Sequence, residues 1–154
     1  MQIVFLCGGI GSRIKKIDNL NPKGMIEINN RPFIDYVIKS LENFNFTSIH
    51  FCLGFKSQKY IDHLKKNYSH LNYTYSIENE EYLLGTGGAI KNCLDFLEDN
   101  FIIQYGDTIV KLNYSDFYKL HLKEKKPITM SILNSYKSEE VPNLFCKKSS
   151  FGEF

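Results

Sequence analysis

The chain has 154 residues, a length that suits one domain with its own hydrophobic core. Hydrophobic residues make up 43% and charged residues 23% of the sequence, as in ordinary globular proteins. The formal net charge of +2 is too small to indicate binding to nucleic acid or to an anionic membrane.

Cysteine and histidine spacing gives no sign of a metal or redox site. The four cysteines are widely separated without a CxxC pair, and the four histidines lack the spacing of metal ligands. No basic region precedes the short N-terminal apolar run, and no stretch reaches the length of a membrane span. These features predict reduced, buried thiols and a cytoplasmic protein.

The first half of the chain predicts two strands and two helices. The apolar run Ile3–Leu6 predicts a strand buried on both faces, as in parallel sheets, and it ends in a glycine-rich loop. A helix is expected over 32–44, with the proline at its first position. Ile49–Leu53 predicts a second buried strand, and a helical stripe follows over 57–68 with Ser57 as the expected N-cap.

The second half continues the alternation of strands and helices. In chain order, the expected elements are a strand at Leu71–Ile77, a helix over 85–97, a strand at Phe101–Tyr105, a helix at Tyr114–Leu122 capped near Ser115, and a strand at Ile128–Leu133.

This alternation indicates βαβ units. The sequence therefore predicts the α/β class, with a Rossmann-like, mainly parallel sheet and helices on both faces in three α/β/α layers. Ligands of such sheets bind beyond the carboxyl ends of the strands. The chain 1–154 is expected to be a single domain, incomplete at its C-terminus because the pattern weakens after Pro127 without a closing element.

The first segment with chemical potential is Gly8-Gly9-Ile10-Gly11-Ser12-Arg13. Glycines after a buried strand let backbone N–H groups cradle a phosphate, and the guanidinium of Arg13 is a planar fork suited to phosphate oxygens. The dinucleotide motif GxGxxG is excluded by Ile14, and no glycine-lysine pair is followed by Ser or Thr as a P-loop requires. A tight turn with an exposed arginine is the alternative.

Three later segments could complete a nucleotide site. Lys23 follows Pro22 and could reach a phosphate as a point charge. Gly85–Ala89 opens a predicted helix, whose N-terminal amides favour negative charge or polar base edges. Asp107 follows Gly106 at the end of a buried strand and could hold Mg²⁺. The alternatives are a solvated lysine, glycines needed for packing, and an aspartate that caps a turn.

Together, the four segments resemble the sugar-phosphate nucleotidyltransferase family. That family carries Gly-Gly-x-Gly-Thr-Arg after its first strand, then Pro-Lys-Pro, Leu-Gly-Thr-Ala/Gly-Gly/Ala and Gly-Asp, which stand here at 8–13, 22–24, 84–89 and 106–107. The Cys-Gly-Gly opening and the Gly-Thr-Gly-Gly-Ala-Ile-Lys stretch are most similar to the D-glycero-D-manno-heptose 1-phosphate guanylyltransferase branch. The resemblance covers Met1 to about Leu133.

The resemblance implies that a sugar 1-phosphate attacks the α-phosphorus of a nucleoside triphosphate and releases pyrophosphate, for surface polysaccharide precursors. It implies catalytic roles for Arg13 and Lys23, Mg²⁺ on Asp107, and GTP or CTP as the favoured nucleotide. The implied nucleotide contacts are Leu6, Gly8, Gly9, Gly11, Ser12, Arg13, Lys23, Gly85, Thr86, Gly87, Gly88 and Asp107. Exposed apolar surface at a sheet edge would favour a homodimer.

Departures from the family pattern qualify these expectations. Gly24 replaces the second proline, which should loosen the loop that holds Lys23, whereas Ser12 keeps the hydroxyl of the usual threonine. Since no second metal carboxylate is recognised after Thr108, the chain should bind nucleotide better than it turns it over. Two alternatives stay open: the same chemistry on another phosphorylated metabolite with CTP or UTP, and a nucleotide-binding regulatory module without turnover.

Overall fold

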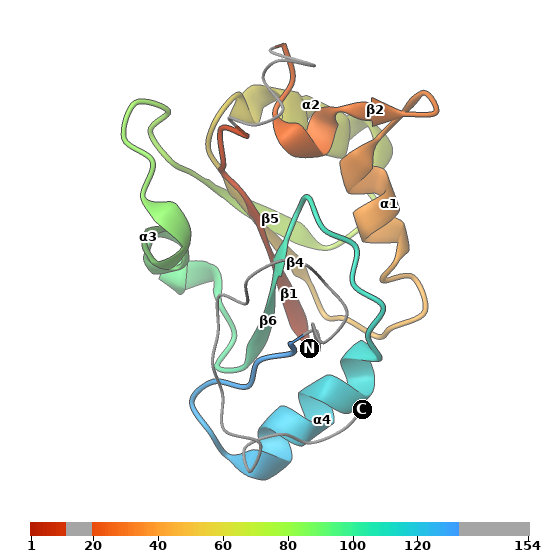
Figure 1. Ribbon diagram of the computed structural model, residues 1–154, viewed down its shortest axis with the longest axis vertical. Coiled ribbons are helices and arrows are strands. Elements are labelled where there is room, and N and C mark those ends of the chain that lie inside the picture. The colour runs from red at the N-terminus through yellow and green to blue at the C-terminus, as the bar shows by residue number, and fades with distance from the viewer. Residues whose placement is uncertain (12–19, 133–154) are drawn as a thin grey trace, which may run out of the picture.

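The structure, a computed structural model, describes residues 1–11 and 20–132. Four strands form a parallel sheet in the order β5-β4-β1-β6 (Figure 1). They are β1 (Gln2–Cys7), β4 (Ile49–Leu53), β5 (Tyr73–Ile77) and β6 (Phe101–Tyr105). Ile3 of β1 pairs with Ile49 of β4 and Ile102 of β6, so the three apolar runs lie in register.

Helical segments connect the strands of this sheet, and one further helix follows its last strand. They are the 3-10 turn η1 (Lys23–Met25), α1 (Phe33–Lys39), α2 (Ser57–Asn67), α3 (Gly85–Asn92), the 3-10 turn η2 (Leu94–Phe96) and α4 (Tyr114–Glu124). A small hairpin joins β2 (Glu27–Ile28) to β3 (Arg31–Pro32). Its central residues, Asn29 and Asn30, both have positive φ, and asparagine tolerates this conformation in tight hairpins.

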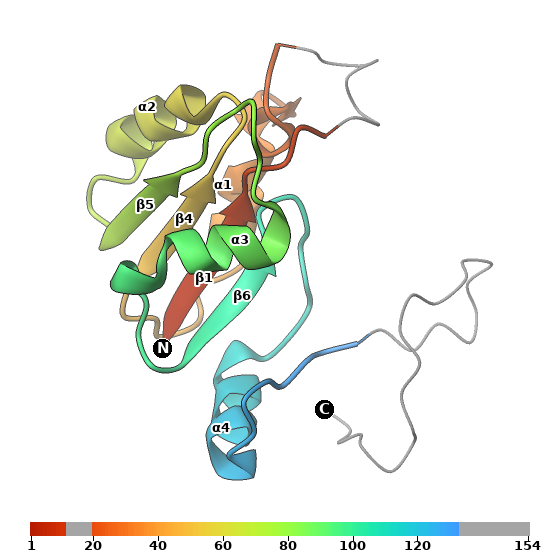
Figure 2. The same ribbon diagram turned by 90° about the vertical axis from the view of Figure 1, so that its left-hand side faces the viewer.

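Helices cover both faces of the sheet, and the face that a side chain meets follows from its place in the strand. Ile3 and Phe5 of β1 point into a large core shared with α1, α2 and α4. Val4, one residue on, points to the other face and packs with Cys52, Ala89 and Cys93 under α3. Figure 2 shows α3 in front of the sheet with α1 and α2 behind it. The predicted parallel sheet in three α/β/α layers is confirmed.

Several helix ends differ from the prediction. Ser57 is not the N-cap of α2, because Lys56 holds that place in a left-handed conformation without a side-chain cap bond. Asn113 caps α4 in place of Ser115, and its side-chain oxygen accepts the N–H of Asp116 at 3.2 Å. Asparagine is about as good an N-cap as serine, and the backbone path places Asn113 at the start of α4.

Two helices are also shorter than the apolar stripes that predicted them. The stripe over 32–44 forms a helix only to Lys39, although Leu41 remains fully buried beyond its end. The stripe over 85–97 breaks at Cys93, and η2 follows. Burial of an apolar side chain therefore continued past the helix, which is why the spacing alone placed the ends too late.

The strand expected at Ile128–Leu133 is wrong for residues 128–132, which form no strand, and Leu133 lies outside the described residues. Ile128 and Met130 are 76% and 64% exposed. An alternating pattern supplies a strand with an apolar face, but its backbone hydrogen bonds need a neighbouring strand. Among the described helices, none is long and apolar enough to cross a membrane.

Candidate active site

A cavity of about 570 Å³ opens beyond the carboxyl ends of the strands, where ligand sites of parallel sheets are expected. Eight of the predicted nucleotide contacts line it: Leu6, Gly8, Gly9, Gly11, Lys23, Gly85, Thr86 and Asp107. Gly87 and Gly88 lie in the first turn of α3 but are not among the lining residues. Ser12 and Arg13 lie outside the described residues.

Lys23 and Asp107 come from segments 84 positions apart and meet in this cavity. Lys23 Nζ donates to Asp107 Oδ2 at 2.7 Å, and the two side chains are 40% and 31% exposed. An ion pair this exposed contributes about 0–1 kcal/mol to stability. Both charges therefore remain accessible to a ligand, the lysine to an anion and the carboxylate to a cation.

The close approach of β1 and β6 explains why a glycine precedes Asp107. A Cβ atom on Gly106 would lie 2.3 Å from Cys7 Sγ, and the Gly106 N–H donates to the Leu6 carbonyl at 3.0 Å. A side chain at position 106 would therefore require the buried Cys7 thiol to move. Glycine avoids this clash directly before Asp107.

Glu78, which the sequence analysis did not single out, lines the same cavity from the end of β5. It is 6% exposed, and its Oε2 accepts the N–H of Leu84 at 2.8 Å, just before α3. The next residue, Gly85, has a φ of +67°, a conformation that favours glycine. Glu78 therefore orients the start of the α3 loop. Its position directly after an expected strand was the signal that could have found it.

Tyr60 is a second lining residue that the sequence analysis missed, because its place in an apolar helical stripe marked it only as core. Its hydroxyl accepts the N–H of Gly24 at 3.1 Å. Gly24 is buried within η1, next to Lys23. The expectation that glycine at position 24 loosens the lysine loop is therefore wrong, since the backbone there is packed and hydrogen-bonded.

The chemistry of the cavity is that of charge and position. Backbone amides and the Lys23 ammonium can bind phosphate oxygens, and Asp107 supplies hard oxygen ligands. Cys7 is the thiol of the lining, and burial raises its pKa well above the usual range. A protonated, buried thiol is a poor nucleophile, so Cys7 is not suited to covalent catalysis.

A separate polar cluster lies under α3. The ligand atoms of His50, Cys52 and Cys93 lie within 4.8 Å of one another, and the two sulfurs are 3.6 Å apart. The ring nitrogens of His50 already meet the hydroxyls of Thr74 at 2.7 Å and Ser76 at 3.1 Å. Burial lowers the pKa of His50 and raises that of Cys52 to about 12. These groups satisfy one another as a neutral network, and we assign no metal to them.

The prediction of buried, reduced cysteines is confirmed for the described part of the chain. Cys7, Cys52 and Cys93 are free thiols, and each is buried. Cys146 lies outside the described residues.

Comparison with known proteins agrees with this geometry. A family model described as nucleotidyl transferase matches residues 2–142. The chain is 35% identical over 126 residues to the D-glycero-alpha-D-manno-heptose 1-phosphate guanylyltransferase of Campylobacter jejuni, covering 82% of this chain and 55% of that protein. The protein of the same name from Aneurinibacillus thermoaerophilus is 30% identical over 133 residues, covering 86% and 57%.

Among solved structures, that of HddC from Yersinia pseudotuberculosis complexed with GMP-PN has a TM-score of 0.69 and 34% sequence identity. The match covers 79% of this chain and 54% of that one. The chain thus spans about half the length of the relatives that it matches. Because the family model extends over most of its residues, the chain belongs to the nucleotidyl transferase family.

Proposed function

We propose that the chain carries the nucleotide-binding part of an enzyme that joins a sugar 1-phosphate to a nucleoside triphosphate. The products would be a nucleoside diphosphate sugar, used for surface polysaccharide precursors, and pyrophosphate. The observation that carries this proposal is the meeting of Lys23 and Asp107 in one cavity with the glycine-rich loop after β1. A cation, a carboxylate and backbone amides suit a polyphosphate and its metal.

In this proposal the residues of the chain act by holding and neutralising the reacting groups. An oxygen of the sugar phosphate attacks the α-phosphorus, the bond to the β-phosphate oxygen breaks, and pyrophosphate leaves with its charge. Lys23 would stabilise the developing negative charge, and the amides of Gly8 and Gly9 would fix the phosphates. Arg13, as the sequence predicts, would add a bidentate contact.

The residues present also fit a Mg²⁺ ion. Asp107 Oδ2 pairs with Lys23, while Oδ1 accepts the Thr108 hydroxyl at 3.1 Å. This partly exposed carboxylate would hold the ion together with phosphate oxygens, which is how proteins usually bind Mg²⁺. When bound, the metal supplies further neutralisation of the phosphate charge.

GTP is our choice of nucleotide, with CTP second, and a heptose 1-phosphate is our choice of sugar. The support is that the relatives from Campylobacter jejuni and Aneurinibacillus thermoaerophilus are guanylyltransferases of such a sugar by name, and that the HddC structure is complexed with GMP-PN. We also propose that the protein acts in the cytoplasm, where nucleoside triphosphates and reduced thiols such as Cys7 are found.

We retain the homodimer as part of the proposal. Strand β6 is an edge of the described sheet, and Ile103 and Tyr105 on it are 46% and 53% exposed. Exposed apolar residues at a strand edge favour pairing with another chain. Sedimentation of the purified chain over a range of concentrations tests this, and a constant monomer mass would contradict it.

The deciding experiment has two parts. Calorimetry measures the binding of GTP, CTP and UTP with and without Mg²⁺, and a pyrophosphate assay then adds heptose 1-phosphate or other sugar phosphates. Asp107→Asn is the matched variant, because it keeps the shape of the side chain and removes its charge. It should lose the Mg²⁺-dependent part of nucleotide binding and change metal-free binding little.

The outcomes separate the alternatives. Absence of nucleotide binding at millimolar concentrations would contradict the proposal. Binding without pyrophosphate release would favour the nucleotide-binding module that acts without turnover. Release with CTP or UTP and a different phosphorylated metabolite would keep the chemistry and change the substrates.

A further inference from the structure

Two neighbouring residues of α2 hold the chain on both sides of Lys23. Lys59 Nζ donates to the Leu20 carbonyl at 2.7 Å and to Asn21 Oδ1 at 2.6 Å. Tyr60, the next residue, accepts the N–H of Gly24 at 3.1 Å. The segment that presents Lys23 to the cavity is therefore fixed to one helix at its beginning and at its end.

The contact between Gly24 and Tyr60 leaves no room for a side chain at position 24. A Cβ atom there would lie 2.5 Å from the Tyr60 hydroxyl and 3.2 Å from the carbonyl oxygen of Gly106. Because Gly24 is buried, an N–H group without an acceptor at this position would destabilise the folded chain. The Tyr60 hydroxyl thus serves as the hydrogen-bond acceptor that water would otherwise supply to the Gly24 N–H.

Tyr60 is itself a fixed point. It is 2% exposed and belongs with Cys7, at the end of β1, to the same hydrophobic core. Burial raises the pKa of Tyr60 well above its ordinary value, so the hydroxyl remains neutral. The bond from the Gly24 N–H to this hydroxyl therefore connects the lysine turn to the core.

We propose that Tyr60 is a positioning residue for Lys23, and that with Lys59 it forms a clamp that holds the Lys23 ammonium in the cavity beside Asp107. Tyr60 lines the cavity but is only 2% exposed, and its hydroxyl already accepts the Gly24 N–H, so the clamp acts through Lys23. The consequence for the nucleotide rests on the proposed function, in which Lys23 binds phosphate. The geometry of the Lys23–Asp107 pair can be tested without any nucleotide.

The first test is NMR of the chain with ¹³Cε-labelled lysine, using Lys23→Arg to assign the Lys23 signal. As a single change, Asp107→Asn should shift that signal away from its wild-type position, because the ion pair is lost. In Tyr60→Phe the Lys23 signal should already lie near the position it takes in Asp107→Asn, and adding Asp107→Asn should shift it little further. Tyr114→Phe is the control, since it also removes the hydroxyl of a buried tyrosine, one bonded to Gln104, and should leave the Lys23 signal unchanged.

The second test is the affinity for GTP with Mg²⁺. Loss of one buried hydrogen bond behind Lys23 should weaken binding by about 3- to 10-fold in Tyr60→Phe. Lys59→Ala, which changes an exposed residue and leaves the core intact, should act in the same direction and guards against misfolding of Tyr60→Phe. Gly24→Ala should be less harmful in the Tyr60→Phe background than alone, because the nearest clashing atom, the hydroxyl, is gone, while the contact with the Gly106 carbonyl remains.

The two readouts test the clamp on Lys23 and the proposed nucleotide binding separately. If neither Tyr60→Phe nor Lys59→Ala moves the Lys23 signal, the clamp is wrong whatever the nucleotide does. If the signal moves in both but the wild type binds no nucleotide, the clamp stands and the proposed function fails.

Discussion

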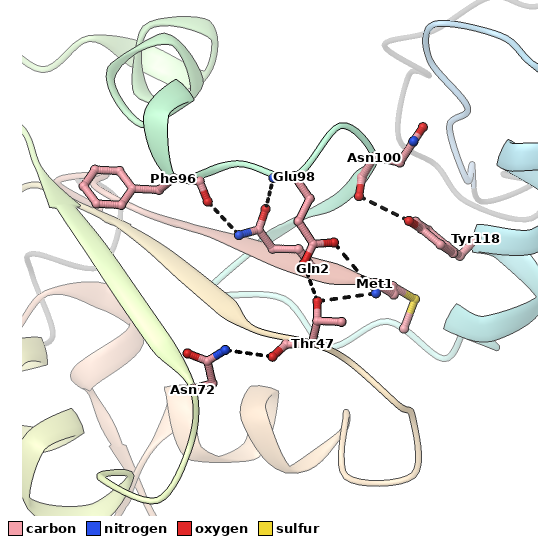
Figure 3. A network of polar contacts seen from close by, with 8 residues as sticks. All are labelled: Met1, Gln2, Thr47, Asn72, Phe96, Glu98, Asn100 and Tyr118. Atoms are coloured by element: carbon pink, nitrogen blue, oxygen red, sulfur yellow. Dashed lines mark hydrogen bonds and ion pairs between the residues drawn. The ribbon is translucent and has the colours of Figure 1, made fainter.

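The two ends of the parallel sheet are built from similar polar groups but use them in opposite ways. At the amino end, the side-chain amide of Gln2 donates to the Phe96 carbonyl at 2.8 Å and accepts the Glu98 N–H at 2.9 Å. The Thr47 hydroxyl donates to the Glu98 carboxylate, and the N-terminal ammonium lies 3.9 Å from it. Figure 3 shows how these groups point toward one another and close the network.

At the carboxyl end, β1, β4 and β6 are each followed by a glycine, and the polar groups surround a cavity. Lys23 and Asp107 contact each other but remain 40% and 31% exposed. The buried Gln2 amide, bonded through both its nitrogen and its oxygen, stabilises the fold, whereas the partly exposed Lys23 and Asp107 keep capacity for a ligand. Changes at the cavity should therefore affect binding, and changes at the amino end should affect stability.

Gly9→Val should separate the effect on ligand binding from the effect on stability most strongly. A Cβ atom on Gly9 would meet no atom within 4 Å, and Gly9 lines the cavity, so the valine would fit the fold and occupy the space proposed for the nucleotide. Calorimetry should detect no GTP binding at concentrations that saturate the wild type, with an unchanged melting temperature. Lys65→Val is the control, because Lys65 is exposed on α2 and does not line the cavity. Equal losses in both variants would contradict the assignment of the cavity.

Lys23→Ala should have the next largest effect. Removal of a charged hydrogen-bond donor to phosphate should weaken GTP binding by about 1.5–3 kcal/mol, which is roughly 10- to 100-fold. The free energy of unfolding should change by less than about 1 kcal/mol, because the ion pair with Asp107 is exposed. Lys119→Ala is the control. It removes a surface ion pair with Asp116 at 3.8 Å and should change neither the GTP affinity nor the free energy of unfolding. Normal GTP affinity in Lys23→Ala would remove Lys23 from the site.

Gln2→Ala should show the reverse behaviour. Gln2 is 3% exposed, and the variant would leave the Phe96 carbonyl and the Glu98 N–H without their partner. Urea denaturation should show a loss of about 1–3 kcal/mol in the free energy of unfolding. The dissociation constant for GTP should stay at the wild-type value at temperatures where the variant is folded. A change in affinity instead of stability would show that the two ends are not independent.

The smallest expected effect is a dependence of stability on pH that comes from His50. Burial lowers the pKa of His50 in the folded state, so the unfolded chain binds the proton more readily. The free energy of unfolding should therefore be unaffected above the unfolded pKa of about 6.5 and fall as the pH drops below it. His50→Gln keeps a neutral side chain that can bond to Thr74 and Ser76. Urea denaturation from pH 7.5 to 5 should show a shallower decline in this variant, and equal slopes would refute the role of His50.

Much of the fold could be predicted from the sequence, because the side chains that define each element are local. The continuous apolar runs of β1, β4 and β6 indicated strands buried on both faces. In the structure β1 pairs in parallel with β4 and with β6. Glycine clusters after the runs marked the carboxyl ends, and Lys23 and Asp107 were named from their neighbours alone. Phosphate and metal chemistry need particular residue types, and these are visible in a linear sequence.

Only the tertiary structure decided which groups meet. The run at 128–132 has the pattern of a strand and forms none, because a strand exists through its neighbour. Tyr60 and Glu78 were not recognised, since a helical stripe marks a tyrosine as core, and Glu78 follows its strand without the neighbouring glycine that marked Asp107. Gly24 was expected to loosen a loop that a distant hydroxyl in fact fixes. The sequence determines the chemistry that each residue can offer, while the distances of 2.7 Å between Lys23 and Asp107 and 3.1 Å between Gly24 and Tyr60 arise from packing between segments far apart in the chain.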